Sequence, residues 1–294
     1  MIEVRGLRRS YDGVEAVRGV DLSVDRGEVF ALLGPNGAGK TTTTEILEGY
    51  RSRSGGEVTV LGHDPARGER ALRERVGIVL QETGVERYLT ARETAVMYAG
   101  LYPHPRDVDE VLEVAGLGAQ RDMRVHRLSG GQRRRLDVAI ALVGDPELLF
   151  LDEPTTGFDP GARRNAWGLV KELAALGKTV FLTTHFMDEA QALADRVAVL
   201  ARGAIVAEGP PSTLAGRHHM QARVRFRVPE GAPAPPQWGQ RATADGVWEI
   251  VTDDPTTTAH ALTGWALERG LTLPHLEIST ASLEDVYLEL TEEA

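Results

Sequence analysis

The sequence predicts an α/β fold that begins with an antiparallel portion and ends in a small second α/β domain. Short β-branched runs alternate with amphipathic stretches from Ile2 to about Val206, a pattern typical of α/β domains. The composition changes after Gly209 to Pro211, where a new set of strands and helices begins. The chain has 294 residues, of which 42% are apolar and 26% charged, as in an ordinary globular protein. No apolar run approaches the ~18 residues of a membrane-spanning helix.

Buried strands and helices alternate along the first domain, which we expect to cover residues 1–215. Four short apolar runs have the length of buried strands, and they lie at 29–33, 147–152, 179–183 and 196–200. Helical spacing is found over 162–176 and 188–194. The first strands, at 2–4 and 20–24, alternate more between apolar and polar residues. We therefore expect these two strands to form the antiparallel portion.

A helical insert interrupts this alternation at about residues 85–135. Its amphipathic stretch runs from Leu89 to Leu117. Thr90 followed by Glu93 is a capping-box pattern, which predicts a helix running toward Leu101. A second helix is predicted over 107–114, with Gly116 near its end.

The second domain, predicted over 216–294, reads as a small α/β unit. Residues 221–228 alternate strictly, which predicts a strand with one solvated face. Further strands are predicted over 246–252 and 271–278, with a helix over 255–269 between them and a final helix over 282–290. These residues are numerous enough for a modest core of their own.

Charge and cysteine content exclude several classes of protein. The formal net charge is −10, so the chain is a poor candidate for wrapping nucleic acid or anionic lipid. The cluster Arg133–Arg135 is too short to indicate a nucleic-acid groove, and we expect a helix face there. Cysteine is absent, which excludes disulfides and thiolate sites. The start of the chain lacks a signal-peptide apolar stretch, and the simplest expectation is a cytoplasmic address.

A glycine-rich loop directly follows the predicted strand at 29–33. The segment from Gly34 to Thr41 fits the pattern G-x-x-x-x-G-K-[ST], and it consists of Gly34, Pro35, Asn36, Gly37, Ala38, Gly39, Lys40 and Thr41. Glycines allow backbone N–H groups to surround a polyphosphate at the positive end of the next helix. Lys40 would reach the β- and γ-phosphates, the Thr41 hydroxyl would ligate Mg²⁺, and Thr42 adds a hydroxyl nearby. The alternative is a chance glycine-rich turn.

Two carboxylates follow the predicted strand at 147–152. A buried strand delivers such side chains to the crevice where α/β sheets bind ligands. Asp152 would hold Mg²⁺ directly or through water, and Glu153 could orient or deprotonate a water that attacks the γ-phosphate. A surface turn is the alternative, and the nearby phosphate loop favours the functional interpretation.

The segment Leu128-Ser-Gly-Gly-Gln132 lies between these two sites, 89 residues from Lys40 to Ser129 and 23 from Ser129 to Asp152. With it, residues 1–215 closely resemble the ATP-binding subunit of an ABC transporter, whose signature is LSGGQ. The resemblance implies a P-loop NTPase fold, an ABC nucleotide-binding domain with antiparallel β and α-helical subdomains. It also implies ATP hydrolysis with ATP and Mg²⁺ as ligands.

The resemblance assigns further roles. Tyr11 matches the aromatic residue that stacks on adenine, and Gln81 matches the Q-loop glutamine that senses Mg²⁺ and the attacking water. Residues 156–160 resemble the D-loop with Asp159, although Phe158 replaces the more usual leucine. His185 matches the switch histidine at the γ-phosphate. Taken alone, Tyr11 could be a core residue and His185 a structural histidine at a strand end.

The signature residues also have a direct physical interpretation. Ser129, Gly130, Gly131 and Gln132 open a helix, so their hydroxyl and N–H groups can form an anion site. In the family this helix end covers the γ-phosphate held by the other subunit. Because the chain carries one loop and one signature, we expect a homodimer that closes on two ATP molecules.

The partner implied by the resemblance is an integral-membrane permease, against which the helical insert would dock. This would hold the chain on the inner face of the cell membrane. Residues 282–290 resemble the tail of ATPases that serve ABC-2 type exporters, including the daunorubicin/doxorubicin resistance group. The function implied is export of a drug, antibiotic, lipid or polysaccharide. The alternative is a non-export ABC ATPase, either an importer subunit or a regulatory or DNA-associated protein.

Overall fold

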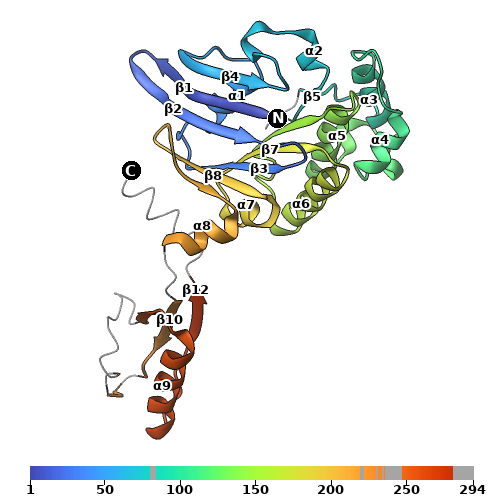
Figure 1. Cartoon of the computed structure of the whole chain (residues 1–294). Coiled ribbons are helices and arrows are strands. Elements are labelled where there is room, and N and C mark those ends of the chain that lie inside the picture. The colour runs from blue at the N-terminus through green and yellow to red at the C-terminus, as the bar shows by residue number, and fades with distance from the viewer. Residues whose placement is uncertain (80–83, 219–221, 230, 234, 236–246, 281–294) are drawn as a thin grey trace. The chain divides into compact units, whose positions relative to one another are not determined.

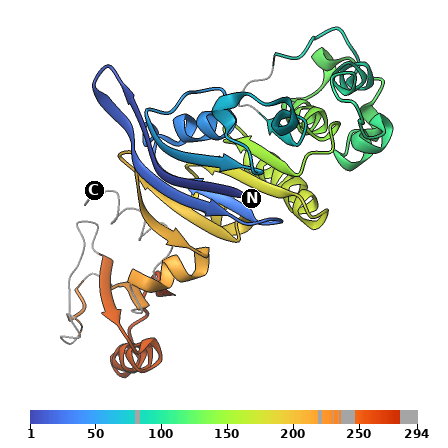
Figure 2. The ribbon, with the colours of Figure 1, turned by 45° about the horizontal axis from the view of Figure 1, so that its top comes forward.

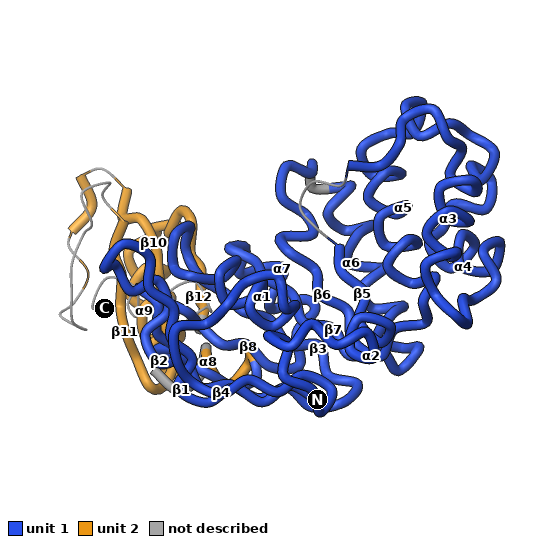
Figure 3. Tube along the Cα trace, turned by 90° about the horizontal axis from the view of Figure 1, so that it is seen from above, with its two compact units in different colours: residues 1–210, 294 blue, residues 211–293 orange. Residues whose placement is uncertain are grey.

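The computed structural model describes residues 1–79, 84–218, 222–229, 231–233, 235 and 247–280. The chain divides into two compact units, Met1–Pro210 and Pro211–Glu293 (Figure 3).

The first unit contains two sheets. The smaller has the strand order β2-β1-β4, with β1 (Ile2–Tyr11), β2 (Val14–Val24) and β4 (Gly55–Val60) all antiparallel. The larger has the order β5-β6-β7-β3-β8-β9. Its strands are β3 (Val29–Leu33), β5 (Val76–Val79), β6 (Leu148–Asp152), β7 (Thr179–Thr184), β8 (Arg196–Ala201) and β9 (Ala204–Gly209). All pairs in it are parallel except β8–β9. The predicted α/β fold with an antiparallel portion is confirmed.

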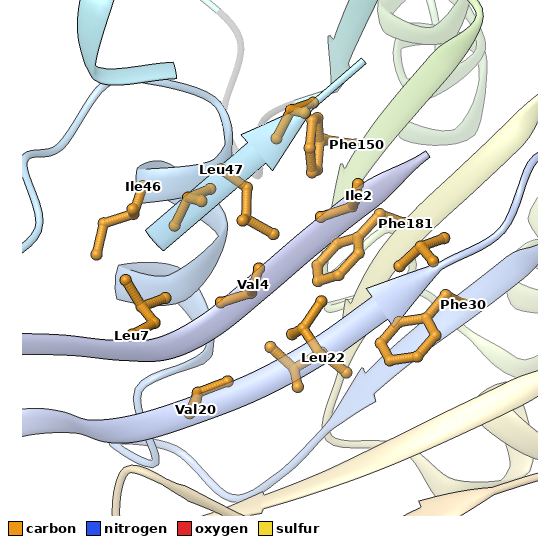
Figure 4. Packing of buried hydrophobic residues seen from close by; sticks show 14 of the residues in the cluster. Ile2, Val4, Leu7, Val20, Leu22, Phe30, Ile46, Leu47, Phe150 and Phe181 are labelled. Carbon is orange, nitrogen blue, oxygen red and sulfur yellow. The ribbon is translucent and has the colours of Figure 1, made fainter. Parts of the chain in front are cut away.

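The main core lies between the two sheets, which face each other in Figures 1 and 2. Apolar residues of the antiparallel sheet, such as Val4 and Leu22, pack toward Phe30, Phe150 and Phe181 of the larger sheet (Figure 4). The Phe30 and Phe181 rings stack with centroids 5.6 Å apart. Every residue of β3 and β7 is buried, because helices cover one face of these strands and the antiparallel sheet covers the other.

The helices lie around the larger sheet. α1 (Lys40–Leu47), α6 (Pro160–Ala175) and α7 (Met187–Leu193) follow β3, β6 and β7 directly. α3 (Ala91–Ala99), α4 (Val108–Val114) and α5 (Gly130–Leu142) gather beside β5 and form the predicted helical insert (Figure 1). The short α2 (Arg70–Arg73) and the 3-10 turns η1 (Pro65–Arg67), η2 (Gly118–Gln120) and η3 (Val125–Arg127) connect these elements.

The second unit has α8 (Pro211–His218) and an antiparallel sheet of order β11-β10-β12. Its strands are β10 (Ala222–Arg227), β11 (Val247–Thr252) and β12 (Glu277–Thr280). α9 (Pro255–Glu268) shares a small core with β10 and β11 around Phe226 and Trp265. The helix predicted over 282–290 lies outside the described residues.

Two predictions about strands were wrong in extent. The first strands are longer than predicted, because irregular pairing between Val4 and Leu7, with Gly6 at φ 58°, breaks the apolar alternation without ending β1. The strand predicted over 271–278 begins only at Glu277. Pro274 has no N–H group to donate, and His275 has a left-handed φ of 55°. The regular ladder therefore begins only after these residues, although the Pro274 carbonyl oxygen still accepts from the Arg227 N–H of β10 at 2.8 Å.

Candidate active site

The loop between β3 and α1 is built by its glycines. Gly37 and Gly39 have φ of 81° and 106°. A Cβ on Gly34 would lie 2.4 Å from the Leu200 carbonyl oxygen, and one on Gly39 would lie 2.6 Å from that of Ala16. No side chain caps α1, which leaves the N–H groups of its first turn available to an anion.

Lys40 connects this loop to the acidic end of β6. Its side chain is only 5% exposed, and its Nζ donates to the carbonyl oxygens of Gly34 at 2.8 Å and Pro35 at 3.2 Å. The same nitrogen lies 3.4 Å from Oε1 of Glu153. Lys40 therefore links the loop to Glu153 directly after β6. Thr41 is exposed and Thr42 half-exposed beside it.

A hydroxyl of the neighbouring strand fixes both acidic residues. Parallel pairing of β6 with β7 brings Asp152 opposite Thr183. The Thr183 hydroxyl donates to Oδ1 of Asp152 and accepts from the backbone N–H of Glu153 at 3.0 Å. Glu153 has a left-handed φ of 43°, a strained conformation for a residue other than glycine. This turn directs its carboxylate back toward Lys40.

The Glu153 carboxylate has three polar neighbours. They are the Thr156 hydroxyl, which donates to Oε2 at 3.0 Å, the Lys40 ammonium, and Nδ1 of His185 at 3.3 Å from Oε1. Burial raises the pKa of Glu153, but the hydrogen bond from Thr156 and the charges of Lys40 and His185 outweigh it, so the pKa is lowered. The group is therefore a carboxylate at neutral pH. The structure brings the predicted residues Lys40, Glu153 and His185 into one cluster.

Tyr11 lies at the end of β1, near the first turn of α1. Its hydroxyl accepts a hydrogen bond from Nη1 of Arg51 at 2.7 Å, and the Arg9 guanidinium lies 4.6 Å from the ring centroid. Burial raises the pKa of this hydroxyl, while hydrogen bonds with Thr42 and Arg9 and the charge of Arg51 lower it overall. Guanidinium groups thus surround the ring that the resemblance assigns to adenine.

The signature segment forms the predicted helix start. Ser129 caps α5 by accepting from the N–H of Gln132 at 3.2 Å, and the Gln132 side chain accepts from the N–H of Ser129 at 2.9 Å. Ser129 and Gly130 are exposed, and a Cβ on Gly130 or Gly131 would meet no atom within 4 Å. This end of α5 is therefore open to another molecule.

Asp159 caps α6 in a similar way, and its Oδ1 accepts from the N–H groups of Gly161 at 2.8 Å and Ala162 at 2.9 Å. Residues of both helix starts line one cavity of about 820 Å³, among them Ser129, Gln132 and Asp159. Phe158, the departure from the family pattern, lines it as well.

The predicted magnesium ligands are only partly described. Thr41 and Asp152 supply hydroxyl and carboxylate oxygens, which suit Mg²⁺. Gln81 lies outside the described residues. Within the part of the chain that the structure describes, no group of three or more His, Cys, Asp or Glu residues could hold a metal ion. A Mg²⁺ ion bound mostly by phosphate and water needs no such group.

Sequence reasoning missed several polar residues of this region. Thr183 and Thr156 hold the acidic residues, and only the register of β7 against β6 reveals the first. Arg134 belongs to a cluster that was expected to be a simple helix face, yet its side chain is only 11% exposed and donates to the Asp152 carbonyl oxygen at 3.3 Å. Glu189 is completely buried near the D-loop segment.

Two family models match this chain, one in each of its two compact units. Residues 17–156 match the family model described as ABC transporter. Residues 222–282 match the model described as ABC transporter domain-containing protein-like, C-terminal domain. Among the described residues, no helix is both long and apolar enough to cross a membrane.

Two relatives align over nearly the whole chain. The daunorubicin/doxorubicin resistance ATP-binding protein DrrA of Streptomyces peucetius is 38% identical over 99% of this chain and 92% of its own length. The Nod factor export ATP-binding protein I of Rhizobium sp. (strain N33) is 39% identical over 99% of this chain and 96% of its own length.

Two solved structures share the fold. CbiO1 from Clostridium perfringens, part of the ABC transporter complex cbiONQ, superposes with a TM-score of 0.68 at 31% identity, over 74% of this chain and 91% of its own. A dimeric ATP-binding cassette in a post-hydrolysis state with ADP and Pi superposes with a TM-score of 0.63 at 25% identity, over 71% of this chain and 98% of its own.

Proposed function

Because this chain belongs to the family of ABC transporter ATP-binding proteins and is an ATPase, we propose that it powers export of a drug, antibiotic, lipid or polysaccharide. The route is a separate ABC-2 type permease, which holds the chain on the inner face of the cell membrane. The observation that carries this proposal is the alignment with DrrA, which covers 99% of the chain and so includes the C-terminal unit.

ATP binds with its phosphates in the loop from Gly34 to Gly39. The uncapped start of α1 and the Lys40 ammonium supply positive charge to the β- and γ-phosphates. The hydroxyl of Thr42 lies near the same helix start, and Tyr11 receives the adenine. Thr41, Gln81 and Asp152 would hold Mg²⁺, whose charge would offset that of the phosphates in the transition state.

Hydrolysis uses Glu153 as the group that orients and deprotonates the attacking water. Its lowered pKa keeps it in the basic form at neutral pH. His185, 3.3 Å from that carboxylate, donates to the γ-phosphate. Gln81 contributes to positioning the water and the metal.

A second copy of the chain completes each site. Ser129, Gly130, Gly131 and Gln132 of one copy cover the γ-phosphate in the loop of the other, because the open start of α5 offers N–H groups and a hydroxyl to an anion. Asp159 lines the same cavity as this helix start, and we place it at the contact between copies. ATP thus favours the closed dimer through contacts that form only there.

The permease docks in a groove of about 610 Å³ beside the helical insert. The end of α1, the start of β5, the end of α3 and part of α5 line it. Tyr50 and Leu101 are 70% and 69% exposed at this groove, and such grouped exposed apolar residues are typical of a protein-binding surface.

Two measurements test the function. We expect a membrane protein encoded beside this chain to co-purify with it and to increase its rate of ATP hydrolysis. Glu153→Gln should retain ATP binding, trap the closed dimer and lower turnover by roughly 10²–10⁴. Glu172→Gln, at an exposed position of α6, is the matched control. Normal hydrolysis by Glu153→Gln would exclude the role of Glu153, and an unchanged rate with the permease would exclude the export function.

A further inference from the structure

Glu189 is a buried carboxyl group that the mechanism above does not use. It lies in the first turn of α7 and is 0% exposed. Its Oε1 accepts hydrogen bonds from the Thr155 hydroxyl at 2.8 Å and from Nε1 of Trp167 at 3.1 Å. Burial of such a group is costly unless specific donors compensate for lost water, so this position is stabilised by its two partners.

These contacts join three segments that surround the cluster of Glu153 and His185. Thr155 lies two residues after Glu153, and Glu189 lies four residues after His185. Trp167 belongs to α6, which begins directly after Asp159. The single oxygen Oε1 of Glu189 therefore fixes the segment after Glu153 to the helix after His185, and both to α6.

A second set of contacts also connects α6 to the residues that follow His185. The Arg163 guanidinium of α6 lies 4.0 Å from the ring centroid of Phe186 and donates to Asp188 at 3.0 Å. The ring of Phe186 lies 4.0 Å from that of His185. The imidazole is thus held from one side by Phe186, while Glu189 holds the helix that follows it.

The pKa of Glu189 is raised, which agrees with a structural role for Oε1 as a hydrogen-bond acceptor. Burial raises this pKa, and hydrogen bonds from the hydroxyls of Thr184 and Thr155 and from Trp167 offset only part of that rise. Oε1 accepts hydrogen bonds whether or not the other oxygen carries a proton. The amide oxygen of a glutamine can therefore replace Oε1 as the acceptor of both hydrogen bonds.

We propose that Glu189 is a positioning residue, which holds His185 against Glu153 by joining α7 to the segment after Glu153. This inference rests on the proposed function, since it assumes that His185 acts in hydrolysis. If this is the role of Glu189, its removal should lower turnover mainly by displacing His185 from Glu153.

A double-mutant cycle tests this dependence. We expect Glu189→Ala to lower kcat about 10-fold or more, with KM for ATP within about threefold of wild type. In a His185→Ala background, Glu189→Ala should lower kcat by less than about twofold further. Glu189→Gln should retain kcat within about threefold, because its amide oxygen still accepts from Thr155 and Trp167.

A second variant covers the case in which Glu189→Ala does not fold. Trp167→Phe keeps the apolar ring and removes only the N–H donor, so we expect a kcat loss of about 2–5-fold that disappears in the His185→Ala background. Equal factors in both backgrounds, or a loss in Glu189→Gln as large as in Glu189→Ala, would overturn the proposal. If His185→Ala alone hydrolyses ATP normally, the role given to His185 in the proposed function is wrong instead.

Discussion

Thr183→Val removes one hydroxyl that serves both acidic residues of the site. Valine has a similar volume and equally favours a strand, so β7 should remain in register. Asp152 Oδ1 loses a donor, and the Glu153 N–H loses one acceptor while keeping the Thr183 carbonyl oxygen at 3.2 Å. A hydrogen bond to a charged group contributes about 1.5–3 kcal/mol and a neutral one about 1 kcal/mol. With one acceptor retained, we expect a loss of about 2–3 kcal/mol in the free energy of unfolding.

The effect on activity separates this residue from an ordinary buried threonine. Thr179 is the matched control, because it lies at the other end of β7, is also 0% exposed, and accepts from the Gly27 N–H at 2.8 Å. Four residues of strand put it ~13 Å from Thr183. Thr179→Val should also lower the free energy of unfolding by about 1–3 kcal/mol, but it should leave the contacts of Asp152 and Glu153 unchanged.

The assay combines urea unfolding with phosphate release at saturating ATP and Mg²⁺, well below the melting temperature of either variant. We expect Thr183→Val to lose about 10-fold or more in kcat, while Thr179→Val stays within about twofold of wild type. Equal losses of kcat in the two variants would refute the reasoning, because the effect would then follow from stability alone.

Three further variants test separate parts of the molecule. Lys40→Ala should weaken ATP binding by about 10–100-fold as well as lowering turnover, measured by equilibrium binding of a fluorescent ATP analogue, because the phosphates lose their main cation. Glu48→Gln should raise the free energy of unfolding by about 1–3 kcal/mol at pH 8.5 and hardly at all below pH 4.5. Burial, with the charges of Asp152 and Glu45, raises the pKa of Glu48 to about 8. Between pH 4.5 and about 8 the folded chain therefore keeps a proton on Glu48 that the unfolded chain has released. The free energy of unfolding of the wild type falls as pH rises through this range. Urea unfolding of wild type and variant at pH 4 and pH 8.5 measures this effect. Thr90→Ala should lower the free energy of unfolding, measured in urea, by about 1 kcal/mol, because α3 loses its N-cap. The rate of ATP hydrolysis should not change, because Thr90 is far from the phosphate loop along the chain.

Features that depend on local chemistry could be predicted from the sequence. The phosphate loop requires glycine at Gly34 and Gly39 and a lysine at the helix start, and all three lie within a few residues. The helix starts at Thr90 and Ser129 are also set by side chains three residues apart, and both capping boxes are present. Spacing within a turn of helix is enough to specify such contacts.

Features that depend on pairing between distant segments could not be predicted. The hydroxyl of Thr183 meets Asp152 only through the register of two parallel strands, and Glu189 meets Thr155 across 34 residues. The left-handed backbone of Glu153 is equally invisible in the sequence, since no glycine marks it. Surrounding contacts maintain this strained conformation, which local propensity alone would not select.

The contacts of Lys40 show how ATP would change the balance of charge in the site. Its ammonium donates to two neutral carbonyl oxygens and lies 3.4 Å from the Glu153 carboxylate. A triphosphate carries several negative charges, whereas the two carbonyl oxygens are neutral and Glu153 carries one charge, so a triphosphate in the loop would draw Lys40 away from the carbonyls and from Glu153. Glu153 then loses part of its countercharge beside Nδ1 of His185, which is 3.3 Å away. Because a carboxylate with fewer cationic partners is more basic, a lysine that moved to the phosphates would also make Glu153 a stronger base toward the proton of a water.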